Sequence, residues 1–387
     1  MWTKLIIALL ILFILLALNL PIYMALLAAG LFMQVFINGM PLRATVTTMF
    51  ESVSQSSLLA IPFFILAGSF LAGGSLGTRL VDVFQAFLKR IRSGVAIACL
   101  LANAFFGAIS GSPPAATATF SKLLYKPLEE QYGETNAVGV IVGASGLSSI
   151  IPPSVVMIIY CVVAEASIAE MFIAGILPGI LLVLIFGAYL LVRCPGHPHK
   201  EDHVRGERRR ALFRSLPVLV LPILVLGGIY GGVFTPSEAG ALSAVYSAFV
   251  SVFVLHDMTL KDFWRVLREG VTTSVQVFIL IAASGVFAQA LTVSQAPQAL
   301  AGLFSGLSPI AFMLILMVVL LIFGCFFDGS SAILILVPML NPVVKALGID
   351  PIHIGIVYCT SLTVGMITPP FGLSLFVAQG VLKKDFT

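Results

Sequence analysis

Two kinds of residue cluster in this chain could bind ions, and each kind occurs once in either half. Residues 107–114 (Gly-Ala-Ile-Ser-Gly-Ser-Pro-Pro) and 324–331 (Gly-Cys-Phe-Phe-Asp-Gly-Ser-Ser) place glycine, serine and aspartate inside apolar segments. A Pro-Pro pair follows in each half, at residues 152–153 and 369–370. Glycine and proline interrupt helices, and an interruption frees backbone carbonyls and amides that a continuous helix would use.

The expected ligands at these interruptions are oxygen atoms. Freed carbonyls, together with the hydroxyls of Ser110, Ser112, Ser149 and Thr368, form the oxygen-only cages that suit a hard cation such as Na⁺. The complementary half-helix N-termini present amide groups to an anionic substrate. The pattern therefore predicts a site for both a cation and an anion.

Asp328 is the strongest single candidate for a functional residue. A carboxylate inside an apolar segment is costly and by default functional, as an ion ligand, a proton relay or a substrate contact. The compatible structural alternative is that Asp328 caps the half-helix that follows it. For the serines and Thr368, the alternative is hydroxyl donation to the preceding helical turn.

Composition defines the elements that must position these residues. Of the 387 residues, 59% are hydrophobic and 10% are charged, and the mean hydropathy is +1.10. Many apolar runs approach the roughly 20 residues that cross about 30 Å of hydrocarbon. The runs are continuous rather than alternating, so they predict helices and not a barrel. No Walker A motif or protease constellation is present, so we expect an all-α polytopic membrane protein that is not an enzyme.

The order of landmarks predicts an inverted repeat, over residues 1–210 and 211–387. Basic residues flank the first apolar hairpin segment, near 94–122, and are nearly absent around the second, near 309–340; the positive-inside rule then places the two hairpins on opposite faces. The first segment is too short for two spans, which predicts a re-entrant hairpin, and the repeat predicts a longer one for the second segment. Paired interruptions of this kind are typical of secondary transporters. A channel, which also uses re-entrant loops, is the disfavoured alternative.

A coarse map completes the second half with helices near 215–231, 237–255 and 271–291 and a Pro-Pro-broken crossing at 353–380. The first half has a corresponding crossing at 135–163, followed by a helix at 171–192. The counterpart of that last helix would begin near residue 387. We therefore expect a final helix that is missing from this sequence.

A basic linker, residues 193–214, joins the repeats and is expected on the cytoplasmic face. Its Arg208-Arg209-Arg210 run is interpreted as an orientation signal. Contact with anionic lipid stays the alternative, and no nucleic-acid partner is expected. His197, His199 and His203 lie near Cys194 without a second cysteine pair at ligand spacing, which disfavours a metal cluster.

Several stretches resemble the large membrane subunit of tripartite ATP-independent periplasmic (TRAP) transporters, a branch of the ion transporter superfamily. The resemblance spans nearly the whole chain, in the expected order, at residues 73–80 (Gly-Gly-Ser-Leu-Gly-Thr-Arg-Leu), 104–112, 151–154, 174–179, 235–239, 347–351 and 367–370. It implies an elevator-type carrier in the inner membrane of a bacterium or archaeon. Such a carrier takes an organic acid, for example a C4-dicarboxylate, from a periplasmic binding protein by Na⁺ symport, in complex with a small four-helix membrane subunit.

The resemblance also assigns roles to individual residues. One Na⁺ would be held by Ser110, Ser112, Gly146, Ser149 and Pro152, and a second by Asp328, Gly365, Thr368 and Pro369. The substrate would contact Ser110, Ser112, Ser154 and Asp328. The alternative is a stand-alone anion or dicarboxylate symporter of the same superfamily, coupled to Na⁺ or H⁺, that needs neither partner.

Overall fold

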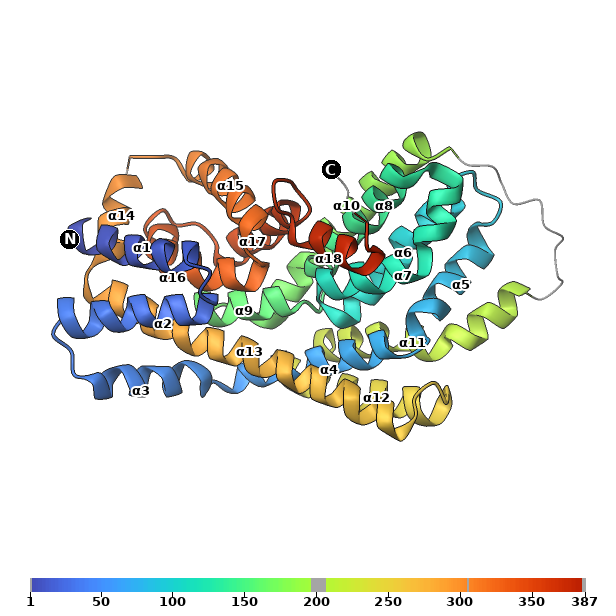
Figure 1. Cartoon of the computed structure of the whole chain (residues 1–387), viewed down its shortest axis with the longest axis horizontal. Coiled ribbons are helices and arrows are strands. Elements are labelled where there is room, and N and C mark those ends of the chain that lie inside the picture. Colours follow the sequence, from blue (N-terminus) through green and yellow to red (C-terminus); the bar gives the residue numbers. More distant parts are fainter. Residues whose placement is uncertain (1, 196–206, 305, 385–387) are drawn as a thin grey trace.

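The computed structural model describes residues 2–195, 207–304 and 306–384, which form helices joined by turns and contain no strand (Figure 1). Within those ranges seven helices are long and apolar enough to cross a membrane. They span Ser56–Gly73, Ile168–Arg193, Arg208–Tyr230, Pro236–Val254, Leu260–Val293, Pro309–Phe326 and Gly329–Ala346. The prediction of an all-α, multi-pass membrane fold is therefore confirmed.

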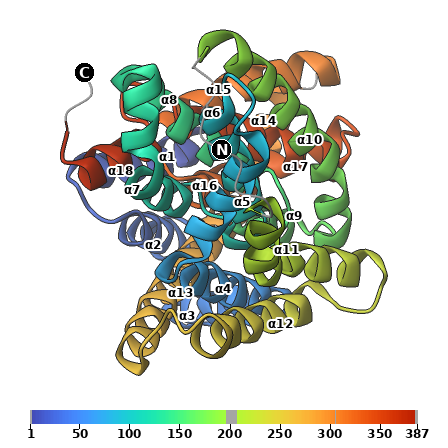
Figure 2. The same cartoon turned by 90° about the vertical axis from the view of Figure 1, so that its right-hand side faces the viewer.

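Five helices form one layer of the molecule, here called the frame. They are α2 (Ile22–Phe32), α3 (Leu42–Val53), α4 (Ala60–Gly73), α12 (Pro236–Phe249) and α13 (Leu260–Val293). Both views show these helices along one side of the molecule, and α13 packs against α2, α3 and α4 (Figures 1 and 2). The frame therefore combines segments from both halves of the chain.

The remaining helices flank or cover this frame. Those that flank it are α1 (Trp2–Ala17), α5 (Leu76–Leu88), α11 (Glu207–Tyr230) and α14 (Ala296–Phe304), whereas α10 (Ile168–Arg193) packs against α6, α9 and α17. Those that cover it, here called the inner helices, are α6 (Gly94–Ser110), α7 (Pro113–Tyr132), α8 (Glu134–Ser145), α9 (Val155–Ala164), α15 (Pro309–Phe326), α16 (Gly329–Ala346), α17 (Pro351–Met366) and α18 (Leu373–Leu382). In each half a helix pair is thus followed by a broken helix.

Each segment predicted as a hairpin contains two helices that extend beyond the predicted bounds. The first, expected near 94–122, is the pair α6 and α7 and continues to Tyr132. The second, expected near 309–340, is the pair α15 and α16 and continues to Ala346. The crossings break where the two Pro-Pro pairs predict, between α8 and α9 and between α17 and α18.

Two helix boundaries differ clearly from the expectation. The helix expected over 215–231 begins at Glu207, as α11. We expected a helix over 271–291, whereas α13 begins at Leu260. A capping box explains the earlier start: the Thr259 hydroxyl accepts from the Asp262 amide at 3.2 Å, and the Asp262 carboxylate accepts from the Thr259 amide at 3.3 Å. Half of the predicted linker, residues 196–206 with His197, His199 and His203, lies outside the described residues. Its last part, residues 207–214, is helical and begins α11.

The frame and the inner helices meet closely at two points. Gly68 of α4 lies against the first hairpin, where a Cβ atom would come within 2.8 Å of the Ser110 Cα. The Ser284 hydroxyl of α13 donates to the Leu334 carbonyl of α16 at 2.5 Å. The frame therefore contacts both hairpins near their tips.

Candidate functional site

The tip of the first hairpin is built from Gly111 and Ser112. Gly111 ends α6 with φ of +58°, a left-handed conformation that glycine adopts without strain. Ser112 then caps α7, and its hydroxyl accepts from the Ala115 amide at 3.5 Å. A Cβ atom on Gly111 would lie 2.8 Å from the Val155 nitrogen. The tip is thus docked against the backbone at the first Pro-Pro break.

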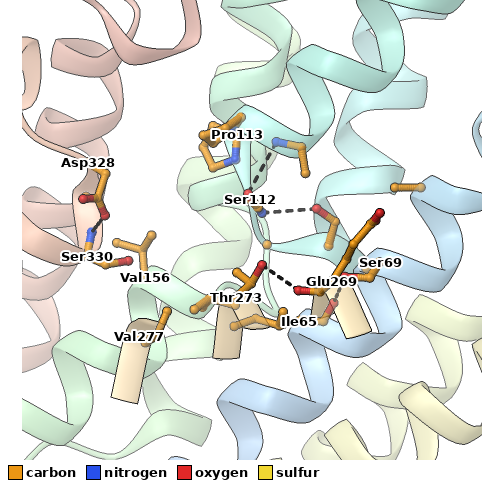
Figure 3. Close-up of a pocket in the computed structure, with 18 of the residues that line it drawn as sticks. Ile65, Ser69, Ser112, Pro113, Val156, Glu269, Thr273, Val277, Asp328 and Ser330 are labelled. Atoms are coloured by element: carbon orange, nitrogen blue, oxygen red, sulfur yellow. Dashed lines mark hydrogen bonds between the residues drawn. The ribbon is translucent and has the colours of Figure 1, made fainter. Parts of the chain in front are cut away.

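The tip of the second hairpin is built around Asp328, which caps α16. One carboxylate oxygen accepts from the Ser330 amide at 3.0 Å and from the Ser331 amide at 3.2 Å, and the Ser331 hydroxyl donates to the other oxygen. Figure 3 shows the carboxylate turned toward Ser330. The capping alternative is therefore realised, and the carboxylate lies at the positive end of a long helix.

Three buried serines flank the first Pro-Pro break. Gly146 begins a turn of 3₁₀ helix that ends at Ser149, and Pro152 follows with a cis bond to Pro153. The hydroxyls of Ser148, Ser149 and Ser154 are buried and have no hydrogen-bond partner. An unsatisfied buried hydroxyl costs about 1–3 kcal/mol. Three such hydroxyl oxygens around one break are ligands of the kind that bind a hard cation.

The second Pro-Pro break is more open. Gly365 is buried at the end of α17, whereas Thr368 and Pro369 are exposed. The Thr368 hydroxyl donates to the Val364 carbonyl at 2.6 Å, which is the donation to a preceding turn that we weighed as its alternative role. Its oxygen still has lone pairs available to a cation.

One cavity of about 720 Å³ joins the broken segments of both halves (Figure 3). Ser110 and Ser112 of the first tip and Asp328 of the second line it. Val155 and Val156, after the first break, and Met366, before the second, complete this part of the wall. The structure therefore brings three of the predicted substrate residues together. The other predicted residues lie outside the lining, namely Gly146, Ser149, Pro152, Ser154, Gly365, Thr368 and Pro369.

The frame supplies a wall of this cavity that the sequence reasoning missed. Arg265, Glu269, Thr273 and Val277 of α13 line it, with Ile65 and Ser69 of α4 and Lys122 of α7. The four α13 residues are spaced four apart, so they share one helix face, and this spacing is the signal that could have identified them. The Thr273 hydroxyl donates to the Glu269 carbonyl at 3.0 Å, and Arg265 pairs with Asp262 at 2.9 Å.

A helical membrane protein in which interrupted segments of both halves line one cavity has the features of a secondary transporter. The family model for the "Tripartite ATP-independent periplasmic transporter, DctM component" matches residues 9–387. The chain belongs to this family of TRAP transporter large permeases. It is accordingly a multi-pass protein of the bacterial inner membrane and not an enzyme.

Two curated relatives illustrate the range of the family. The chain is 40% identical over 344 residues to the C4-dicarboxylate TRAP transporter large permease protein DctM of Pseudomonas aeruginosa, covering 88% of this chain and 81% of the relative. It is 35% identical over 382 residues to the ectoine/5-hydroxyectoine large permease protein UehC of Ruegeria pomeroyi, covering 96% and 89%. Relatives of similar identity are thus named for chemically different substrates.

The fold is also similar to a solved transporter structure of low sequence identity. The crystal structure of the YdaH transporter of Alcanivorax borkumensis, described as having an unusual topology, aligns with a TM-score of 0.54 and 16% identity. The alignment covers 89% of this chain and 82% of that one. At this identity the similarity concerns the fold alone.

Proposed function

We propose that this chain is the large membrane subunit of a TRAP system that imports an organic acid anion by Na⁺ symport. The observation that carries the proposal is the shared cavity, because Ser112 and Asp328 line it from opposite halves of the chain. A carrier whose two tips face one space can bind an anion and the coupling ion next to each other.

The anion is expected at the tips. Ser112 and Asp328 begin α7 and α16, so the positive ends of both helices lie at the cavity. Pro113 and Pro114 open α7 without amide hydrogens, so this helix acts on an anion through its dipole.

The cavity also has two cationic side chains, Lys122 and Arg265, in its wall. Two carboxylates, Glu269 and Asp328, line the same cavity, so the formal charge of its wall is balanced. The expected anion therefore depends on local contact with Lys122 and Arg265 and with the helix ends, and not on the net charge of the wall.

The coupling ion is expected behind the tips. The three unpartnered hydroxyls at the first break supply oxygen ligands without a carboxylate, which suits Na⁺ better than a divalent ion. Asp328, Gly365, Thr368 and Pro369 would hold a second Na⁺ at the other break. In this arrangement Ser110 and Ser112 contact both the ion and the substrate.

The partners follow from the tripartite description of the family. We expect a small four-helix membrane subunit beside this chain and a periplasmic binding protein that delivers the substrate. Neither would be needed by a stand-alone anion symporter, which is the competing function. The two functions differ in one measurable requirement, the binding protein.

Uptake into proteoliposomes tests the proposal. This chain and its membrane partner are reconstituted, a Na⁺ gradient is imposed, and radiolabelled C4-dicarboxylates, sugar acids and keto acids are offered with and without the binding protein. We expect saturable uptake of one anion class that requires both Na⁺ and the binding protein. Na⁺-driven uptake without the binding protein would support the stand-alone symporter, and non-saturable flux would support a channel.

A further inference from the structure

Outside the central cavity, the first turns of α11 form a strongly basic hollow, here called the arginine surface. It has a volume of about 430 Å³ and is lined by Arg209, Arg210, Phe213 and Arg214. None of these lining residues is acidic. Figures 1 and 2 show α11 beside α5, on the side of the molecule away from α14.

The arginine surface lies where the apolar part of α11 begins. The candidate membrane span starts at Arg208 and runs to Tyr230. Phe213 is 60% exposed and Leu216 is 46% exposed, so apolar side chains face outward within two turns of the arginines. Three guanidinium groups at the border between an apolar surface and water occupy the depth at which phospholipid headgroups lie.

Neighbouring side chains orient these arginines. Arg209 lies over the Phe213 ring, with its Cζ 5.5 Å from the ring centroid. Arg208, in contrast, turns to α5, where it stacks on Phe87 and donates from Nε to the Ala86 carbonyl at 3.3 Å. The run of three arginines is therefore divided, since one fixes α11 to α5 and two line the hollow.

Arg79 of α5 is hydrogen-bonded to the part of α11 that forms the arginine surface. Its Nη1 donates to the Arg214 carbonyl at 3.2 Å, and the Ser215 hydroxyl donates to the Arg79 carbonyl at 2.8 Å. Arg79 also donates from Nε to the Ser75 hydroxyl at 2.9 Å and lies 3.8 Å from the Asp257 carboxylate. The arginine surface is thus connected to the junction between α4 and α5 and to the start of α13.

Among the described residues, Asp82 is an acidic group that interacts with Arg79 and Arg214. Burial raises the pKa of its carboxyl, and the Arg79 and Arg214 guanidinium groups oppose that rise. Asp82 belongs to α5 and does not line the hollow.

We infer that the arginine surface binds the headgroup of an anionic phospholipid, with Arg209, Arg210 and Arg214 on the phosphate and Phe213 beside the acyl chains. Planar guanidinium groups bind phosphate oxygens in pairs, which an ammonium group does not do. Phe213 and Leu216 favour a lipid over a free anion, because a soluble phosphate would leave this apolar surface uncovered. Basic pockets beside membrane helices are an established mode of anionic lipid recognition.

Thermal unfolding of the purified full chain in a neutral detergent tests the inference. Phosphatidylglycerol or, separately, phosphatidylcholine is added to the wild type and to the double variant Arg209→Gln/Arg210→Gln. The matched control is Lys261→Gln/Arg268→Gln, which removes two exposed basic groups from the first turns of α13. We expect phosphatidylglycerol to raise the unfolding midpoint of the wild type and the control. The rise should fall by at least half in the arginine double variant, and phosphatidylcholine should act equally on all three proteins.

Three results would overturn the inference. An equal phosphatidylglycerol response in both double variants would show general charge attraction. The same rise with inorganic phosphate would assign the surface to a soluble anion, and the same rise with a short single-stranded RNA would assign it to nucleic acid. If the double variant does not fold, native mass spectrometry of wild type and Arg210→Gln decides. We expect at least a threefold loss of bound phosphatidylglycerol, and unchanged occupancy contradicts the site.

Discussion

Ser112 and Asp328 line the same cavity, and each caps the helix that follows a hairpin tip. They come from different halves of the chain. Their side chains also use different chemistry for the same capping task, since one is a hydroxyl and the other a carboxylate. A negative charge is therefore present at one tip only, which makes Asp328 the residue that distinguishes the ion and substrate roles of the two tips.

Asp328→Asn separates the charge of this residue from its capping role. Asparagine and aspartate cap helices about equally well, so the variant should fold and insert. Loss of the charge should reduce transport at least tenfold, or about 1.4 kcal/mol. The measurement is Na⁺-driven uptake in proteoliposomes, normalised to the amount of folded protein.

Asp350→Asn is the matched control for that change. Asp350 caps α17, accepts from the His353 amide at 2.7 Å and does not line the cavity. This variant should transport normally. Near-normal uptake by both variants would leave Asp328 as a structural cap.

Ser149→Ala and Ser154→Ala test the first break as an ion site. Each hydroxyl is buried without a partner, so its removal should leave stability in K⁺ buffer unchanged or higher. At a Na⁺ concentration about 100-fold above Kd, binding would stabilise the wild type by about 2.7 kcal/mol. We expect the Na⁺-dependent rise in the thermal midpoint to be largely lost in both variants.

Ser247→Ala provides the comparison for these serine variants. Its hydroxyl is equally buried and unpartnered but belongs to α12 in the frame. The substitution should leave the Na⁺ response intact. If all three variants respond to Na⁺ like the wild type, the first break does not bind the ion.

Gly68→Ala tests whether the hairpin must slide along the frame. The added Cβ would lie 2.8 Å from the Ser110 Cα, and such overpacking costs about 1–3 kcal/mol. An elevator-type carrier should then spend less time in the arrangement in which Ser110 lies against Gly68. Thr273→Cys reports this, because it lines the cavity while the five cysteines of the described chain are buried. We expect its labelling by a membrane-impermeant thiol reagent to slow at least threefold.

Gly139→Ala is the matched glycine variant. No atom lies within 4 Å of the Cβ that it would add. Adding Gly139→Ala to the Thr273→Cys protein should therefore leave the labelling rate of Thr273→Cys unchanged. Equal labelling in the Gly68 and Gly139 variants would mean that the first hairpin does not dock on α4 during transport.

An ion-pair cluster predicts how acid affects the end of α18. Lys384 donates to Glu129 at 2.7 Å and to Glu134 at 3.0 Å. The hydrogen bonds from Lys384 and Tyr125 lower the pKa of the Glu129 carboxyl below its ordinary value of 4.5. Because the folded-state pKa is depressed, the stabilisation is complete above the ordinary pKa and is lost as the pH falls through the folded-state value.

Hydrogen exchange of α18, corrected for intrinsic rates, checks this pH dependence. Protection should be constant between neutral pH and about pH 5 and should decrease on further acidification. Lys384→Ala should remove that acid-dependent step. A change in protection centred near neutral pH would contradict the assignment to Glu129.

The interruptions could be predicted from the sequence because their causes are local. Gly111 and the Pro-Pro pairs break helices through their own backbone chemistry, and Asp328 caps the helix that it precedes. The cavity wall on α13 could not be found from hydropathy, because Arg265 and Glu269 resemble residues of a loop. Its recognition needed the Thr259 capping box, which starts the helix earlier.

Non-local packing explains what else the sequence did not reveal. That the hydroxyls of Ser149 and Ser154 lack partners depends on the docking of the Gly111 tip against Val155. The division of the arginine run depends on Phe87 and Ala86 of α5. Neither contact follows from a local pattern, since each joins segments that are distant in the chain.

Co-uptake of radioactive sodium with the imported anion tests the central claim most directly. Proteoliposomes containing this chain and its partners receive labelled sodium without a Na⁺ gradient, and an inward gradient of the anion is then imposed. We predict that the anion gradient drives sodium accumulation in the vesicles and that Asp328→Asn abolishes it. Anion uptake that proceeds without Na⁺, driven equally by a proton gradient, would contradict the claim that the broken segments couple the two ions.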